Sequence, residues 1–387
     1  MQTFTSKLPN VGTTIFSIMS ALANKHGAVN LSQGFPDFEA SKQLIELVTE
    51  AMKKGFNQYA PMPGAPPLRE IIAEKTQELY GASCHPDTEI TVTVGASEAL
   101  FSVLASFVRE GDEVIFFEPA YDLYLPVIEL FGGIPVPIPL NKEDYGINWE
   151  KTKEAVNEKT KFIIINTPHN PTGAVLLEED MQQLIALTKD KDIFLIGDEV
   201  YEHIVFDGIR HESLLRYPEL RDKSFVISSF GKTYHTTGWK IGYCIAPPAL
   251  TKEFRKVHQY NAFCITSPMQ YALAEFLKIK ENYLELPQFY QERRDVFRKL
   301  LAQTSFELLP CKGTYFQLAS YGHLSQEKDT DYAERITKEV GVATIPLSPF
   351  YLDHTDHKVL RFCFAKRTET MEQAIDKLIQ KAYLLKE

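Results

Sequence analysis

The chain contains 387 residues, more than the roughly 100–200 of one typical domain, so the sequence predicts two domains. Hydrophobic residues make up 44% and charged residues 24%, a composition that excludes a disordered or low-complexity protein. The chain has 51 acidic against 41 basic residues, a net charge of −10, which argues against nucleic acid or anionic lipid as a partner.

The cysteines indicate a reducing compartment. There are 5, widely spaced and without a CxxC pair, which is typical of free thiols and not of a disulfide framework or a zinc site. The start, MQTFTSKLPN, lacks the charged-then-apolar order of a signal peptide, and no apolar run approaches the ~18 residues that span a bilayer. We expect a soluble cytoplasmic protein that binds no membrane.

In chain order, residues 1–40 are rich in polar and turn residues and are expected to form an arm and a loop. Residues 41–275 are expected to form a large domain, because short β-branched runs alternate with segments of helical spacing. The helical pattern is clearest at 96–110 and 178–190, and the predicted strands cover 89–95, 112–119, 161–168, 192–200, 223–230 and 239–247. Strands with consecutive apolar residues favour a parallel sheet covered on both faces.

The pattern changes after residue 275. Charged helical stretches at 283–303, 331–340 and 370–385 surround short strand candidates at 306–311 with 314–319, at 342–347 and at 359–365. Residues 276–387 therefore predict a smaller α+β domain, to which the 1–40 arm is assigned. With no flexible linker between them, the two domains should pack closely, and a cleft between them is the expected substrate site.

The segment SSFGKTYHTTGWKIGY (228–243) places Lys232 just past a buried strand. A phosphate-loop interpretation fails because Val226 stands where that motif needs glycine, and no GxGxxG occurs anywhere in the chain. A desolvated lysine loses proton affinity and becomes an amine nucleophile. A surface lysine in a turn is the structural alternative.

Three further segments place polar groups where predicted strands end. Asp198 and Tyr201 follow a strongly apolar strand, Asn170 lies in NTPHNPTG (166–173), and a helix should begin at Ala96 or Ser97. Ligands collect at the carboxyl ends of parallel strands, and a helix N-terminus favours anions. Taken singly, these residues could equally be a helix cap, a turn and an ordinary helix start.

Together, and in this order, the four segments resemble the fold-type-I pyridoxal-phosphate aminotransferases of class I/II. LSQGFPDF (31–38), NQYAPMPGAPPLRE (57–70) and VLRFCFA (359–365) extend the resemblance over nearly the whole chain. The motifs are most similar to the branch of bacterial methionine aminotransferases and kynurenine/glutamine aminotransferases. The resemblance implies an α/β fold with a large, mostly parallel-sheet domain wrapped by helices and a smaller α+β domain.

The resemblance also implies roles around the cofactor, pyridoxal 5′-phosphate. Lys232 matches the lysine that bonds to it covalently and then moves the substrate proton. Asp198 matches the carboxylate on the pyridine nitrogen, while Tyr201 and Asn170 match the pair on the 3-oxygen. The implied phosphate site comprises Ala96, Ser97, Ser229, Lys240 and, from a partner subunit, Tyr59. Tyr121 falls where the family has a ring stacked on the cofactor; core packing is its alternative.

For the substrate, Arg361 matches the arginine that binds the α-carboxylate, with Gly34 and Asn170 beside it. Phe16, Tyr59, Tyr315 and Phe263, the last from the other subunit, fall near positions that line an apolar side-chain pocket. His169, His203 and His235 lie near the motifs without metal-ligand spacing and are expected to pack and hydrogen-bond, so no metal is expected.

These expectations combine into a homodimeric transaminase acting on a neutral, hydrophobic L-amino acid and a 2-oxo acid, with methionine as first donor and aromatic amino acids, leucine and kynurenine next. One alternative is a cysteine-S-conjugate β-lyase on the same fold. A second is a non-catalytic cofactor- or amino-acid-sensing module, and a third is a nicotinamide-dependent oxidoreductase, which lacks its glycine signature here.

Overall fold

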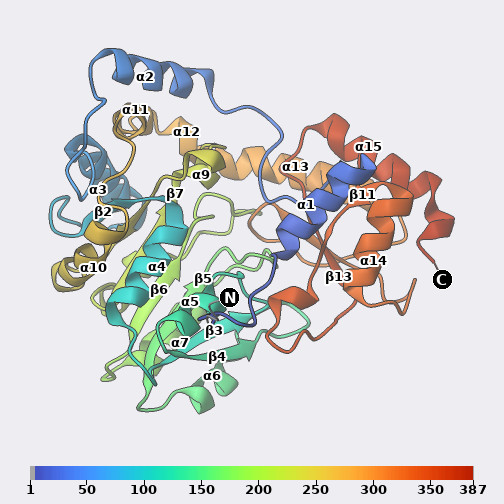
Figure 1. The fold of residues 1–387 in the computed structure, drawn as a ribbon, viewed down its shortest axis with the longest axis horizontal. Helices are drawn as coiled ribbons and strands as arrows, with labels where there is room; N and C mark the ends of the chain where they lie inside the picture. Colours follow the sequence, from blue (N-terminus) through green and yellow to red (C-terminus); the bar gives the residue numbers. More distant parts are fainter. Residues whose placement is uncertain (1–4, 387) are drawn as a thin grey trace.

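A seven-stranded sheet forms the centre of the computed structural model, which describes residues 5–386 (Figure 1). Residues 1–4 of the expected arm therefore lie outside the described residues. In sheet order the strands are β2 (Ile90–Thr93), β8 (Gly242–Ile245), β7 (Ser224–Ser229), β6 (Phe194–Asp198), β5 (Thr160–Asn166), β3 (Glu113–Glu118) and β4 (Ile134–Pro139). Strand β8 runs antiparallel to both neighbours, and the remaining pairs are parallel. The prediction of a mostly parallel sheet is confirmed.

The sequence analysis missed strand β4, whose sequence is IPVPIP. Proline cannot donate a hydrogen bond to a sheet, so it is found on edge strands. Strand β4 lies at the edge of the sheet and pairs only with β3 among the described strands. Its position explains how a run with three prolines forms a strand here.

The side chains on the two faces of the sheet pack into separate hydrophobic cores, because successive side chains of a strand point to opposite sides. In β3, Val114 and Phe116 belong to one core, and Ile115 and Phe117 belong to the other. Helices α4 (Gly95–Phe107), α5 (Tyr124–Leu130) and α10 (Pro248–Asn261) contribute to the first core. Helices α2 (Lys42–Lys53), α3 (Pro66–Tyr80), α7 (Glu178–Thr188) and α11 (Ser267–Leu277) contribute to the second.

The C-terminal part contains an antiparallel four-stranded sheet, in the order β12 (Ile345–Pro346), β13 (Val359–Cys363), β10 (Phe316–Ser320) and β9 (Glu307–Leu308). Its helices include α13 (Leu286–Leu301), α14 (Asp329–Arg335) and α15 (Thr368–Gln380). The expected strand at 342–347 divides, because β11 (Val342–Ala343) leaves this sheet to pair with β1 (Val29–Asn30). The short helices are α6 (Trp149–Ala155), α8 (Pro218–Arg221), α9 (Phe230–Thr233) and α12 (Glu281–Leu284).

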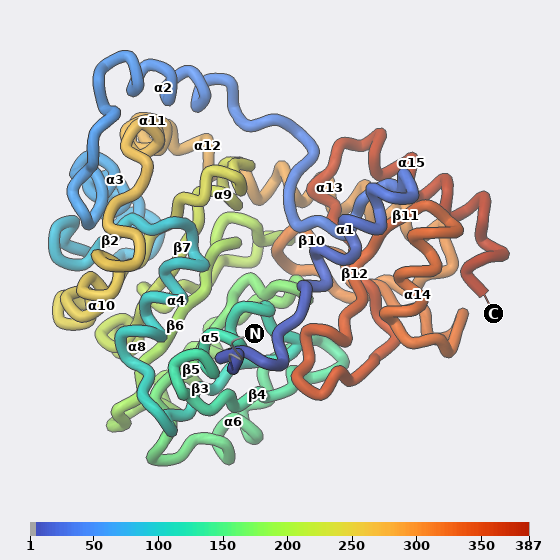
Figure 2. Tube along the Cα trace, viewed as in Figure 1, coloured from blue at the N-terminus to red at the C-terminus, as the bar shows by residue number. Residues whose placement is uncertain are grey.

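The N-terminal segment contains a helix, α1 (Ile15–His26), where the sequence analysis expected only an arm and a loop. The Thr14 hydroxyl accepts a hydrogen bond from the Ser17 amide at its start, and Gly27 ends it with φ 59°. These are the usual start and stop signals of a helix. Figure 2 shows α1 running among the C-terminal elements. The division at residues 40 and 275 remains a proposal.

The carboxyl ends of β5, β6 and β7 lie side by side and end at Asn166, Asp198 and Ser229. Helix α4 starts directly after β2, at the same side of the sheet as these ends. The fold therefore gathers the polar motifs at one edge, as expected for parallel strands. Within residues 5–386, no helix is both long and apolar enough to cross a membrane.

Candidate active site

A cavity opens at this edge of the sheet, with about 710 Å³ of space that is continuous with solvent. Nine of the ten residues predicted to bind the cofactor line it, and Tyr59 does not. The lining residues are Gly95, Ala96, Ser97, Leu100, Tyr121, Asn166, Asn170, Asp198, Val200, Tyr201, Ser229, Gly231, Lys232, Thr237 and Lys240. The structure thus brings together side chains from positions 95 to 240.

Lys232 lies in the short helix α9, directly after β7, with its side chain in the cavity. Its Nζ is 3.5 Å from the Gly34 carbonyl oxygen and lies over the rings of Tyr201 and Tyr315, at 5.6 and 5.8 Å from their centroids. Burial lowers the pKa of Lys232 to about 8, and the charges of Lys240 and Arg361 act in the same direction. An amine with this pKa is partly neutral near physiological pH, as nucleophilic attack and proton transfer require.

Asp198 ends β6 with its carboxylate buried against the cavity. Its Oδ2 accepts a 2.6 Å hydrogen bond from the Tyr124 hydroxyl, while the buried Oδ1 has no hydrogen-bond partner. Burial raises the pKa of Asp198 to about 6, and the Tyr124 hydrogen bond opposes that rise. A buried carboxylate oxygen without a partner suits a ligand that brings a positively charged N–H.

The sequence analysis missed Tyr124 and Asn166. The Asn166 side chain donates through Nδ2 to the Asp198 backbone carbonyl oxygen at 2.8 Å. Its Oδ1 accepts from the Asn170 backbone amide, also at 2.8 Å. It therefore ties the end of β6 to the turn that carries Asn170. Asn166 is the first residue of the NTPHNPTG motif, so its position could have predicted it as a site residue. The sequence around Tyr124, by contrast, does not distinguish it from Tyr121.

A candidate anion site lies between the start of α4 and Lys240. Gly95 has φ +66°, and a Cβ added there would lie 3.4 Å from the Lys240 ammonium nitrogen. A Cβ at Gly242 would lie 2.6 Å from the Ser228 carbonyl oxygen and 3.0 Å from the Ala96 amide nitrogen. The two glycines allow the helix N-terminus, β8 and Lys240 to approach closely, and free amides beside an ammonium group suit a phosphate.

Arg361 lies in the middle of β13 and is buried at 1% exposure. Its Nη1 donates to the Asn170 side-chain oxygen at 2.8 Å and its Nη2 to the Ser32 carbonyl oxygen at 3.1 Å, while Nε has no partner. Burial lowers the pKa of Arg361 to about 10. The guanidinium is therefore still charged at neutral pH, and it retains a free donor for an anion.

Aromatic rings surround this guanidinium. Its central carbon lies 3.9 Å from the Phe316 ring centroid, 5.1 Å from that of Phe16 and 5.7 Å from that of Phe350. Phe16 also contacts Phe350, with ring centroids 5.7 Å apart. Apolar rings beside a charge exclude water and leave room for a hydrophobic side chain next to a carboxylate.

Gly34 and Tyr315 meet beside Lys232, because the Tyr315 hydroxyl donates to the Gly34 carbonyl oxygen at 2.6 Å. A Cβ at Gly34 would lie 3.0 Å from the Phe316 ring, so the loop approaches that ring closely. Tyr59 and Phe263 are not gathered into the cavity of this chain. They are 82% and 44% exposed and contact each other, with ring centroids 5.5 Å apart.

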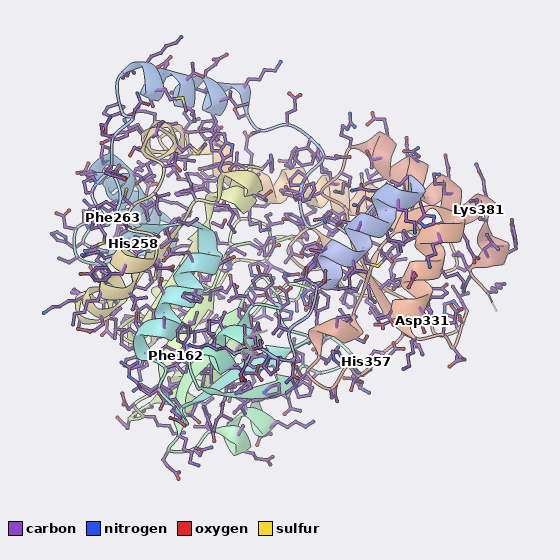
Figure 3. All side chains as sticks on the ribbon, viewed as in Figure 1. Phe162, His258, Phe263, Asp331, His357 and Lys381 are labelled. Carbon is purple, nitrogen blue, oxygen red and sulfur yellow. The ribbon has the colours of Figure 1, made fainter. Side chains whose placement is uncertain are left out.

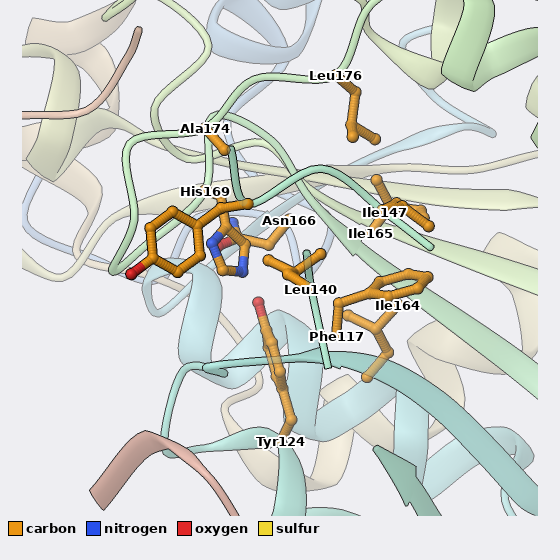
Figure 4. Close-up of a pocket in the computed structure, with 11 residues that line it drawn as sticks. Phe117, Tyr124, Leu140, Ile147, Ile164, Ile165, Asn166, His169, Ala174 and Leu176 are labelled. Carbon is orange, nitrogen blue, oxygen red and sulfur yellow. The ribbon is translucent and has the colours of Figure 1, made fainter. Parts of the chain in front are cut away.

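A small second cavity adjoins the first at Asn166, which lines both, and Tyr124 lines the second (Figure 4). Most of its lining is apolar, including Phe117, Ile165 and Leu176. An apolar cavity beside Tyr124, whose hydroxyl donates to Asp198, is consistent with the burial that raises the pKa of that carboxyl.

Burial also lowers the pKa of each of the three histidines near the motifs, to about 3 for His169 and His203 and about 4 for His235. All three are therefore neutral near pH 7. The His169 Nδ1 lies 2.8 Å from the Thr172 hydroxyl, and the His235 ring lies edge-on to that of Phe38, with centroids 4.7 Å apart. Among residues 5–386, no cluster of three or more His, Cys, Asp or Glu side chains could hold a metal ion. Burial and these contacts favour packing and hydrogen-bonding roles.

Residues 26–378 match the family model of aminotransferase class I and II, and the chain belongs to this family. Methionine aminotransferase of Escherichia coli (strain K12) is 48% identical, over 97% of this chain and 97% of the relative. The kynurenine–oxoglutarate transaminase of Dictyostelium discoideum is 36% identical, over 95% and 94%. A crystal structure of Escherichia coli YbdL, for which a methionine aminotransferase function was identified, superposes with a TM-score of 0.96 at 47% identity, over 98% of this chain and all of that one.

The family resemblance is thereby confirmed, and the protein is a pyridoxal-phosphate-dependent transaminase. Its substrates are small molecules, an amino acid and a 2-oxo acid. The residues of the cavity fit that cofactor. The unpartnered Asp198 oxygen, the amine of Lys232 and the anion site at Lys240 match a pyridine nitrogen, an aldehyde and a phosphate.

Proposed function

We propose that this transaminase takes the amino group from a neutral, hydrophobic L-amino acid, with methionine as first donor and phenylalanine, tyrosine, leucine and kynurenine next. The observation that carries the proposal is the enclosure of Arg361 by three aromatic rings beside the cavity of Lys232. A substrate whose α-carboxylate binds Arg361 would place its own side chain among these three aromatic rings. The names of the two curated relatives support the same substrate class.

We assign the residues that would hold the cofactor from the same geometry. Lys232 would bond to it, Asp198 would keep its ring nitrogen protonated, and the start of α4 with Ser229 and Lys240 would bind its phosphate. Tyr201 and Asn170 would face its 3-oxygen, and Tyr121 would stack on its ring. When bound, the protonated ring accepts the electron pair that remains after a proton leaves the substrate Cα.

The chain's own residues then orient the substrate and move the proton. Arg361 binds the α-carboxylate through the guanidinium N–H groups that remain free, Nε among them, with Gly34 beside it. A fixed carboxylate fixes the direction of the Cα–H bond. Lys232 has a pKa of about 8, which allows both protonation states. It removes this proton from Cα and then donates it to a different atom.

We propose that the active protein is a homodimer. Tyr59 is 82% exposed and contacts Phe263, which is 44% exposed, so this face carries exposed aromatic rings; Tyr260, three residues before Phe263, is 87% exposed. Figure 3 shows Phe263 at the end of the molecule opposite Lys381 and Asp331. A second copy seated on this face would cover the rings and bring its Tyr59 to the phosphate and its Phe263 to the substrate pocket.

We also propose a cytoplasmic location. All five cysteines are free, and four of them, Cys84, Cys244, Cys311 and Cys363, are buried. Buried free thiols suit a reducing compartment.

A single-turnover experiment tests the proposal. Purified protein with bound cofactor should be yellow, and methionine added without an oxo acid should bleach the visible band once, with one 2-oxo acid released per site. Screening all twenty amino acids in this way should rank the hydrophobic donors above aspartate. A yellow protein that reacts with no amino acid would contradict the proposal. Pyruvate and ammonia formed from a cysteine S-conjugate without an acceptor would instead indicate β-lyase activity.

A further inference from the structure

The turn after β6 carries two buried carboxylates that the proposed reaction does not use. Asp198 and Tyr201 line the cofactor cavity, whereas Glu199 and Glu202, from the same turn, do not. Glu199 is 1% exposed and Glu202 is 5% exposed. Burying a carboxylate is costly unless it is paired and hydrogen-bonded, so both require partners away from the cavity.

The partners of Glu202 come from α3 and β8. The Lys75 ammonium donates to its Oε1 at 2.8 Å and to the Tyr243 hydroxyl at 2.8 Å, and that hydroxyl lies 3.0 Å from the same Oε1. The Tyr80 hydroxyl donates to the other carboxylate oxygen. Burial alone would raise the pKa of Glu202, but the Lys75 charge and these hydrogen bonds hold it well below its ordinary value. Glu202 is therefore an anion inside the protein.

Glu199 is fixed separately, by the segment that follows the turn. It accepts a hydrogen bond from the Leu214 amide at 2.9 Å, and its other oxygen lies 2.9 Å from the His211 Nε2. A Cβ added at Gly197 would lie 2.9 Å from the Leu214 side chain and 3.0 Å from the Glu199 carboxylate. The glycine therefore allows Leu214 and the carboxylate to approach the strand closely.

These two anchors fix a very short piece of chain. The backbone adds a hydrogen bond from the Glu199 amide to the Ile227 carbonyl oxygen at 2.8 Å, which attaches the turn to β7. Asp198 and Tyr201 are each adjacent in sequence to an anchored glutamate. A backbone displacement at Glu199 or Glu202 would therefore also move a group that is predicted to bind the cofactor.

We propose that Lys75 and Glu202 are positioning residues that, with Tyr80 and Tyr243, set the place of Tyr201 against the cofactor, while Glu199 separately holds the place of Asp198. The proposal rests on the proposed function for the identity of those two groups. Packing alone does not account for the pair, because apolar residues of similar volume commonly replace a buried ion pair without loss of stability. Hydrogen bonds, unlike apolar contacts, fix direction as well as distance, and the turn needs both.

The test is the neutral double variant Lys75→Met/Glu202→Gln, which removes both charges and leaves no unpaired one. The proposal expects a folded protein whose cofactor binds about tenfold more weakly and whose visible band titrates at a different pH. The single-turnover rate with methionine should fall about tenfold, with KM changed by no more than about twofold, because a small misplacement costs mainly the chemical step. A folded double variant with the cofactor affinity, spectral titration and rate of the wild type would overturn it.

A matched control separates positioning from stability. Arg335 and Glu327 form a partly buried ion pair in the C-terminal part, 2.9 Å apart. Arg335→Met/Glu327→Gln should leave the spectral titration unchanged, whatever its effect on the melting temperature. If the double variant at Lys75 and Glu202 does not fold, Tyr243→Phe, which removes one hydroxyl of the network, takes its place with the same readouts and criteria. Cofactor affinity and the spectral titration need no substrate, so they report on the network even if the wild type proves inactive towards every amino acid.

Discussion

The cofactor side of the cavity takes its residues from the ends of adjacent strands, whereas the carboxylate side takes them from segments far apart in the chain. Asn166, Asp198 and Ser229 end β5, β6 and β7, and Lys232 follows three residues later. Arg361, by contrast, bonds to Asn170 and to the Ser32 carbonyl oxygen, 191 and 329 residues away. A rigid sheet edge suits a group that stays bound, and a site assembled from several segments suits a substrate that enters and leaves.

The largest expected loss comes from the cofactor side. Replacing Lys232 with Ala removes both the nucleophile and the base, so turnover should fall by about 10⁴-fold or more. The cofactor should still bind through the phosphate site and Asp198, but without a covalent bond. Borohydride reduction followed by peptide mapping measures this. The label should be found at Lys232 in the wild type and be lost in the variant, and a label at another lysine would contradict the assignment.

Removing the guanidinium donors on the carboxylate side of the cavity should reduce activity less than removing Lys232. Arg361→Met keeps the apolar surroundings but removes the donors, and kcat/KM for methionine should fall roughly 10²–10³-fold, as for loss of one partner of a buried charge pair. Steady-state kinetics with methionine and 2-oxo acid measures it. The cofactor spectrum should remain normal, unlike that of Lys232→Ala. The exposed Arg367, at the start of α15, provides the control Arg367→Met, which should leave kcat/KM unchanged.

A smaller change tests how Asp198 is tuned. The Tyr124 hydroxyl donates to the ionised carboxylate and so lowers the pKa of Asp198. In Tyr124→Phe that pKa should rise above about 6, and less of the carboxylate is ionised at acid pH. The acid limb of the kcat/KM profile should therefore move to higher pH, with a loss of about threefold to tenfold near pH 6 and less at pH 8.

Tyr145→Phe is the matched control for this pH profile, because it removes a hydroxyl beside the second cavity that does not bond to Asp198, and it keeps the ring. Its profile should overlay that of the wild type. An unshifted profile in Tyr124→Phe would mean that the hydrogen bond does not influence catalysis.

Substrate choice, and not the overall rate, should change when the apolar rings are altered. Phe350 contacts Phe16 and lies over Arg361, so Phe350→Ala should widen the apolar region beside the carboxylate. The ratio of kcat/KM for methionine to that for phenylalanine should fall by about fivefold to tenfold, because a small change of pocket volume is worth only about 1–2 kcal/mol. Phe350→Leu should retain most of the wild-type ratio. An unchanged ratio in Phe350→Ala would place the side-chain pocket elsewhere.

The sequence alone determined much of the fold and of the cofactor side. Asp198, Ser229 and Lys232 directly follow or end apolar strands, and the ends of neighbouring parallel strands meet at one edge of a sheet. The local sequence pattern was therefore enough to predict that these residues lie together. Prediction from the sequence failed where the local pattern was ambiguous. The edge strand β4 was not predicted because of its prolines, and the capped helix α1 was not predicted because polar residues precede it.

Only the tertiary structure decided which distant side chains meet. Tyr124 bonds to Asp198 across 74 residues, and Lys75 bonds to Glu202 across 127. Nothing near Tyr124 or Lys75 in the sequence distinguishes them from tyrosines and lysines that merely pack or face solvent. Their partners are fixed by how α3 and α5 pack on the sheet, and the directions and burial of those contacts set the charge states on which the chemistry depends.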